Sequence, residues 1–227
     1  MKIGILQTGH VNEQLVAENG DYSEIFPAFL ADQGLSFETY AVCDGLFPDG
    51  PEMAEGWLIT GSRFGAYEDW PWIAPLEQLI RDIYASDRPL VGICFGHQII
   101  AQALGGRVEK FSGGWCIGRQ DYVLNGETYA LNAWHQDQVV AVPEGGEVIS
   151  STGFCENAAI VYGNRAFTLQ PHPEINRTYL SGMLMVLGLD TVPQALRDAA
   201  IAQLDRPTHS ARLADMIAQF FKEKRIA

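Results

Sequence analysis

The first half of the chain alternates short apolar runs with amphipathic segments. The apolar runs predict buried strands at residues 2–7, 37–42, 56–60 and 89–93. The amphipathic segments predict helices at residues 23–33, 72–84 and 99–104. Strands that alternate with helices of this length indicate a parallel sheet covered by helices on both faces.

The pattern changes in the middle of the chain, where Gly, Asn and Pro break up short β-type runs. These runs cover residues 108–111, 121–124, 138–142, 147–151, 158–162 and 166–169. They predict an antiparallel region inserted into the parallel sheet. Helices return after Asn176, where Thr191 and Gln194 fit a capping box and an apolar stripe over residues 213–221 marks a final helix.

The chain contains neither an internal repeat nor a clear linker. Its 227 residues suit one large domain, with or without a small addition. We therefore expect one α/β domain over residues 1–187, and a helical extension over residues 188–227 that packs on the same domain.

Cys94 stands where the apolar run of residues 89–93 gives way to a helical pattern. Gly92 and Gly96 flank it and leave room for a tight turn. A strand–turn–helix elbow of this kind projects a nucleophile out of the sheet. Free cysteine is often only a small buried hydrophobe, so a catalytic role for Cys94 requires a base and a group that orients the base.

Two prolines place candidates for both groups side by side. Gln170 and His172 each precede a proline, which favours an extended conformation. Residues two apart in an extended chain point to the same side, so His172 and Glu174 should be neighbours. Glu174 can then hold one ring nitrogen of His172 and leave the other for a thiol.

These segments resemble the motifs of a known family. Residues 92–98 resemble the nucleophile motif of class I glutamine amidotransferase domains, and residues 170–174 resemble their HPE motif. Gly61-Ser62 resembles the loop that supplies their oxyanion hole, and residues 134–139 resemble a segment that precedes one of their strands. The order and spacing of all four segments match over roughly residues 1–187.

The resemblance implies an open, flavodoxin-like α/β sandwich and a thioester mechanism. Cys94 would attack the γ-carboxamide carbon of glutamine, with the backbone N–H groups of Phe95 and the Gly61 loop as the oxyanion hole. His172 would protonate the leaving ammonia and then activate water, and Glu174 would orient His172. No cofactor and no metal take part in this chemistry.

The resemblance also suggests substrate-binding residues. Gln98 lies one helical turn beyond Cys94 and would contact the bound glutamine, although an exposed helix residue is the alternative. His135 and Asp137 would line the glutamine pocket, or else satisfy each other's hydrogen bonds. His10 follows the first strand, where α/β sheets place binding crevices, although a single loop histidine is more often solvated.

Composition narrows the possible partners. The formal net charge of −13 argues against nucleic acid, whose phosphates would be repelled. The four cysteines are scattered along the chain without the spacing of metal ligands. We therefore expect free thiols in a reducing compartment. No apolar stretch is long enough to span a bilayer, and residues 1–6 lack a secretory pattern. We therefore expect a cytoplasmic protein that does not bind membranes.

Three functions fit these residues. One is a glutamine amidotransferase-type hydrolase that releases ammonia from glutamine for a separate synthase subunit. Another is a free-standing γ-glutamyl peptidase, since residues 59–62 and 92–100 also resemble plant γ-glutamyl peptidases. The third is a non-enzymatic scaffold or sensor, which would be expected to lose a triad residue, and Cys94, His172 and Glu174 are all present. The leaving group alone separates the two enzymes.

Overall fold

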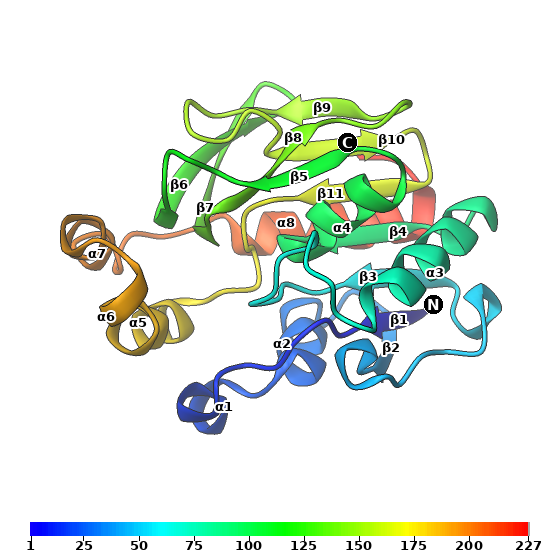
Figure 1. The fold of residues 1–227 in the computed structure, drawn as a ribbon, viewed down its shortest axis with the longest axis horizontal. Coiled ribbons are helices and arrows are strands. Elements are labelled where there is room, and N and C mark those ends of the chain that lie inside the picture. Colours follow the sequence, from blue (N-terminus) through cyan, green and yellow to red (C-terminus); the bar gives the residue numbers. More distant parts are fainter. Residues whose placement is uncertain (227) are drawn as a thin grey trace.

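A computed structural model describes residues 1–226 as an α/β fold around one seven-stranded sheet (Figure 1). The strand order is β2-β1-β3-β4-β11-β10-β9. Strands β2 through β11 in this order run parallel, and β10 and β9 continue the sheet in antiparallel fashion. The strands span β1 Lys2–Leu6, β2 Ser36–Tyr40, β3 Gly56–Ile59, β4 Leu90–Ile93, β9 Glu147–Ser150, β10 Ala159–Tyr162 and β11 Ala166–Leu169.

Two antiparallel ribbons extend from this sheet. Strand β5 pairs with β8, and β6 pairs with β7. Their bounds are β5 Arg107–Lys110, β6 Cys116–Leu124, β7 Glu127–His135 and β8 Asp137–Ala141. The predicted combination of a parallel sheet with an antiparallel insertion is confirmed.

Helices cover both faces of the sheet. Their bounds are α1 Glu13–Asn19, α2 Tyr22–Phe29, α3 Ile73–Ala85, α4 Phe95–Ala103, α5 Arg177–Val186, α6 Gly188–Thr191, α7 Gln194–Ile201 and α8 Ser210–Glu223. Figure 1 shows α3 and α4 in front of the sheet and α8 behind it. Along β3, Leu58 packs with the α2 and α8 layer, whereas Trp57 and Ile59 pack with the α3 and α4 layer, as strand alternation requires. None of the described helices is both long and apolar enough to cross a bilayer.

The C-terminal helices do not all occupy the same place. The apolar stripe of α8 is buried against the sheet, where Phe220 and Phe167 lie with ring centroids 5.8 Å apart. Residues of α5 and α7 instead form a separate apolar cluster with α1, with Trp134 of β7 and with Trp115, which directly precedes β6. This smaller cluster lies beside the ends of the parallel strands that carry the site described below (Figure 1).

Three local features differ from the sequence-based expectations. Strand β7 was not expected, although the Asn125-Gly126 turn before it, with positive φ at both residues, is a typical hairpin signal. Helix α1, capped by the Asn12 side chain, was also not expected. The predicted capping box at Thr191 is wrong: Thr191 ends α6, and its hydroxyl donates to the Leu187 carbonyl 2.8 Å away.

His97 of α4 is fully buried beneath the sheet's carboxyl edge. Its Nδ1 lies 2.8 Å from the hydroxyl oxygen of Thr168 on β11. Burial lowers the pKa of His97 to about 3, because the imidazolium would lose its hydration. His97 therefore serves the packing of α4 on the sheet as a neutral ring.

Replacing His97 by Gln should make the free energy of unfolding depend less on pH between about pH 3 and pH 6.5. An unfolded His binds a proton below about pH 6.5, whereas folded His97 stays neutral until about pH 3. In that window the unfolded state binds more protons, so stability falls as pH falls, by up to ~1.4 kcal/mol per pH unit. Urea unfolding across the window should show a smaller slope in His97→Gln than in the wild type, and equal slopes would contradict this account.

Candidate active site

Cys94 sits in a strained turn between β4 and α4. Its backbone has φ 51° and ψ −101°, a conformation that non-glycine residues rarely adopt. The turn leaves no room for a side chain at Gly92 or Gly96. A Cβ on Gly92 would lie 2.5 Å from the Gly96 carbonyl oxygen, and a Cβ on Gly96 would lie 2.4 Å from the Ile59 carbonyl oxygen. The structure thus places Cys94 at an elbow of the predicted kind.

His172 and Glu174 lie side by side, both buried. Nδ1 of His172 is 2.7 Å from Oε1 of Glu174. Burial disfavours the imidazolium of His172, but its interactions with Cys94 and Glu174 outweigh the effect of burial and raise the pKa of His172 well above its usual value. Because Glu174 occupies Nδ1, Nε2 is the nitrogen left to face the thiol.

Backbone pairing fixes the segment that carries these two residues. The His172 N–H donates to the Asn132 carbonyl of β7 at 2.8 Å, in an isolated antiparallel bridge. The Asn132 side chain donates to the Ile175 carbonyl at 2.8 Å. Asn132 thus holds the chain on both sides of Glu174. No pattern in the sequence predicts this role.

Gln170 is a further site residue that the sequence reasoning missed. It is fully buried, and its Nε2 donates to Sγ of Cys94 at 3.5 Å. Its Oε1 accepts a hydrogen bond from Nε2 of Gln98 at 3.1 Å. The same two-residue alternation that pairs His172 with Glu174 puts Gln170 on their side, so the signal was available.

The Gly61 loop after β3 lies against His172. A Cβ on Gly61 would be 3.0 Å from Cε1 of His172. The hydroxyl of Thr8, after β1, donates to the Gly61 carbonyl at 3.1 Å, and Ser62 Oγ donates back to the Thr8 carbonyl at 2.6 Å. On the other side of Cys94, Phe95 is the first residue of α4, where backbone N–H groups have no partner within the helix.

A cavity of about 440 Å³ opens beside Cys94. The predicted substrate-binding residues Gln98, His135 and Asp137 all line it. Its other lining residues are Ser62, Arg63, Phe64, Gly65, Tyr67, Glu68, Lys110, Trp115, Trp134, Gln136, Leu187 and Thr191. The walls therefore come from the loop after β3, from both ribbons and from the region where α5 gives way to α6.

The polar groups of this cavity are only partly paired. Nε2 of Gln98 donates to the Asp137 carbonyl at 2.9 Å, and Nδ1 of His135 lies 3.2 Å from the same oxygen. Burial lowers the pKa of His135 to about 3, so its ring is neutral. Nε2 of His135 is buried and has no protein partner in the described part of the chain. Asp137 accepts a hydrogen bond from the Tyr67 hydroxyl at 3.1 Å, so His135 and Asp137 do not pair through their side chains.

The chain also matches the model of a known protein family. The family model "Glutamine amidotransferase class-I" matches residues 56–185, more than half of the chain. The chain belongs to this family. The matched region contains the Gly61 loop, the Cys94 elbow and the segment with His172 and Glu174, whereas β1, β2 and α8 lie outside it.

Relatives of this amidotransferase domain cover most of its length. It is 28% identical to Gamma-glutamyl peptidase 4 of Arabidopsis thaliana, over 90% of this chain and 88% of that protein. It is 27% identical to a glutamine-hydrolyzing GMP synthase of Porphyromonas gingivalis, over 89% of this chain but 40% of that protein. A solved glutamine amidotransferase from Methylobacillus flagellatus has the same fold, with a TM-score of 0.75, 21% identity, and 100% of this chain and 96% of that chain covered.

The elbow of this amidotransferase domain should not tolerate a side chain at Gly96. In Gly96→Ala the new Cβ would meet a backbone oxygen, and overpacking of this kind lowers the free energy of unfolding by about 3 kcal/mol. Gly153→Ala is the matched control, because no atom lies within 4 Å of its new Cβ, and it should stay within about 0.5 kcal/mol. Equal unfolding free energies of the two variants in urea would refute the close contact.

Proposed function

We propose that this protein hydrolyses the γ-glutamyl C–N bond of γ-glutamyl peptides or conjugates through a thioester on Cys94. The observation that carries the proposal is that Cys94, which interacts with the buried His172–Glu174 pair, lines a pocket larger than a single amino acid needs. A cavity of about 440 Å³ is in the range that takes drug-sized ligands.

Acylation starts from the thiolate of Cys94 and the imidazolium of His172. The raised pKa of His172 favours this ion pair, and Glu174 at 2.7 Å keeps the ring oriented. Sulfur attacks the γ-carbonyl carbon, and the backbone N–H groups of Phe95 and Gly61 stabilise the oxyanion. His172 then gives its proton to the leaving nitrogen, and the C–N bond breaks.

Deacylation uses the same residues, with His172 now acting as a base instead of an acid. Neutral His172 takes a proton from a water molecule, whose oxygen attacks the γ-glutamyl thioester carbon. The tetrahedral intermediate collapses, the C–S bond breaks, Cys94 leaves as a thiolate, and glutamate is released with a free γ-carboxylate. The hydrogen bond from Gln170 to the sulfur helps to stabilise the thiolate in both half-reactions.

The pocket walls suit a zwitterionic γ-glutamyl group with a bulky leaving group. Asp137 and Glu68 provide negative charge for an α-ammonium, and Lys110 and Arg63 provide positive charge for carboxylates. The tryptophan pair Trp115 and Trp134, with centroids 6.2 Å apart, adds apolar surface that glutamine alone would not cover.

The relatives also favour an amine or peptide as the leaving group, in place of ammonia. The γ-glutamyl peptidase relative matches over nearly its whole length, whereas the GMP synthase relative is matched over less than half of its own. A glutaminase subunit that hands ammonia to a separate synthase uses the same triad and is the second candidate. A scaffold without activity is the third, and the complete triad argues against it.

Substrate preference separates these candidates. Purified protein should release free amine from γ-glutamyl dipeptides with a kcat/KM about 100-fold above that for ammonia release from glutamine, because only dipeptides fill the wider pocket. Cys94→Ala should abolish both reactions. Faster turnover of glutamine would favour the amidotransferase subunit, and no difference between wild type and Cys94→Ala would favour the scaffold.

The orienting role of Glu174 gives a second test. Glu174→Gln keeps a hydrogen-bond acceptor for His172 but removes the charge that stabilises the imidazolium. We expect kcat/KM to fall by about 100- to 10,000-fold, and the basic limb of the pH–rate profile to move to lower pH. Glu156→Gln, an exposed carboxylate away from the pocket, is the control and should keep wild-type kinetics. Wild-type kinetics in Glu174→Gln would exclude the triad.

A further inference from the structure

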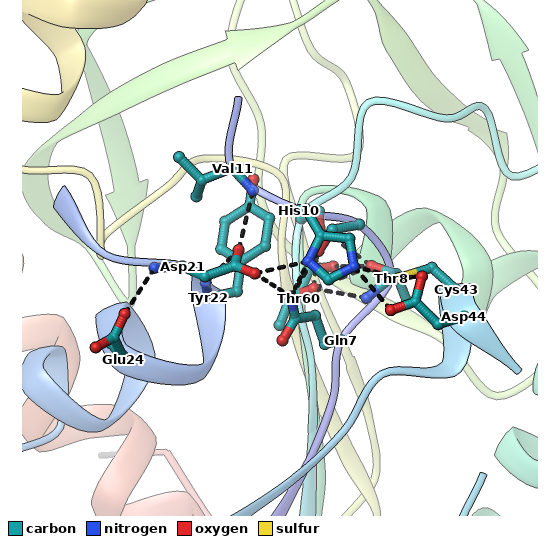
Figure 2. A network of polar contacts seen from close by, with 12 residues as sticks. Gln7, Thr8, His10, Val11, Asp21, Tyr22, Glu24, Cys43, Asp44 and Thr60 are labelled. Carbon is teal, nitrogen blue, oxygen red and sulfur yellow. Dashed lines mark hydrogen bonds and ion pairs between the residues drawn. The ribbon is translucent and has the colours of Figure 1, made fainter. Parts of the chain in front are cut away.

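A second cluster of reactive side chains lies outside the catalytic pocket. His10 follows β1, and Cys43 and Asp44 follow β2. One potential ligand atom from each of these three residues lies within 4.8 Å of the other two. Figure 2 shows the His10 ring between the carboxylates of Asp21 and Asp44, with Cys43 beside Asp44.

Asp21 fixes the orientation of the His10 ring. Its Oδ2 lies 2.6 Å from Nδ1 of His10, which turns Nε2 toward Asp44 and Cys43 (Figure 2). Asp21 is itself held by the backbone N–H groups of Val11 and Tyr22 and by Nε2 of Gln7, at 2.8 to 2.9 Å. A carboxylate on the far nitrogen of a histidine is the arrangement that orients metal-binding histidines.

The three remaining donors lie close to the spacing of a tetrahedral zinc site. Nε2 of His10 is 3.7 Å from Sγ of Cys43 and 2.9 Å from Oδ2 of Asp44. Zinc–ligand bonds of about 2.0 to 2.3 Å put tetrahedral donors about 3.3 to 3.8 Å apart. Sγ of Cys43 also lies 3.8 Å from Oδ1 of Asp44. The two distances from Cys43 are therefore near the tetrahedral spacing, and an ion would require the Asp44 carboxylate to move about half an ångström away from Nε2 of His10.

The cluster also faces a cavity. His10, Cys43 and Asp44 line a hollow of about 810 Å³, which Arg63 and Phe64 separate from the catalytic pocket. The hollow lies at the carboxyl ends of β1, β2 and β3, where the strand order reverses direction, and open α/β sheets place ligands at this point.

We propose that His10, Cys43 and Asp44 form a binding site for a divalent zinc-type metal ion, with Asp21 as the residue that orients His10. The mixture of imidazole, thiolate and carboxylate ligands suits zinc. It does not suit magnesium or calcium, because these ions prefer oxygen ligands only. Three protein ligands leave one tetrahedral position for water or for a molecule in the hollow. Binding replaces the thiol proton of Cys43 and the Nε2 proton of His10, both of which go to solvent. The site does not depend on the proposed hydrolase activity.

Metal titration of the full-length protein tests this site. After chelator treatment and dialysis, calorimetry should find one Zn²⁺ per chain. Co²⁺ should produce a thiolate-to-metal charge-transfer band that Cys94→Ser retains and Cys43→Ser loses. The comparison of the two cysteine variants excludes metal bound by the catalytic thiol.

Carboxylate variants provide a second readout. Asp21→Asn should weaken Zn²⁺ binding about 10- to 100-fold, since it acts through the orientation of His10, and Asp44→Asn should weaken it further. Asp49→Asn, an exposed neighbour outside the cluster, should bind as the wild type does. Circular dichroism of each variant checks that it is folded. The site is refuted if no stoichiometric metal binds, or if Cys43→Ser and Asp44→Asn bind like the wild type; His10 is then an imidazolium held between two carboxylates.

Discussion

The geometry of the candidate active site depends on how closely α4 approaches β3 and β4 behind Cys94. Two absent side chains permit that approach, at Gly92 and Gly96, and the Ile59 carbonyl leaves no space for a larger residue. The backbone strain at Cys94 persists because the packing around it leaves no relaxed alternative. As a result, the thiol emerges at the carboxyl edge of the sheet with the first N–H groups of α4 beside it.

Parallel pairing brings the other groups to the same edge. Strands β1, β3, β4 and β11 are consecutive neighbours in the sheet, so the residues that follow each of them meet at one end. Thr8 follows β1, Gly61 follows β3, Cys94 follows β4 and Gln170 follows β11. Residues far apart in sequence thus form one site, and the hydrogen bonds between Thr8 and the Gly61 loop fix the spacing of two adjacent loops.

The sequence revealed those parts of the site that depend on local backbone chemistry. Glycines around Cys94 and prolines around His172 constrain φ and ψ directly, so their consequences could be predicted from neighbouring residues alone. The role of Asn132 could not be predicted in this way, because it depends on where β7 lies against the segment around His172. The cluster of His10 and Cys43 was hidden for the same reason: its ligands follow two different strands, and no spacing along the chain marks them.

The first turn of α2 connects the two sites. Asp21 caps this helix and holds His10, while the next residue, Tyr22, lies near Gly61 and Glu174. The Tyr22 hydroxyl lies 3.7 Å from where a Cβ on Gly61 would be. Burial and the nearby Tyr179 and Glu174 raise the pKa of Tyr22 well above its usual value, so it stays a neutral hydroxyl. Adjacent residues at the start of α2 therefore lie against the Gly61 loop and the His10 cluster, so a change in the position of α2 would reach both.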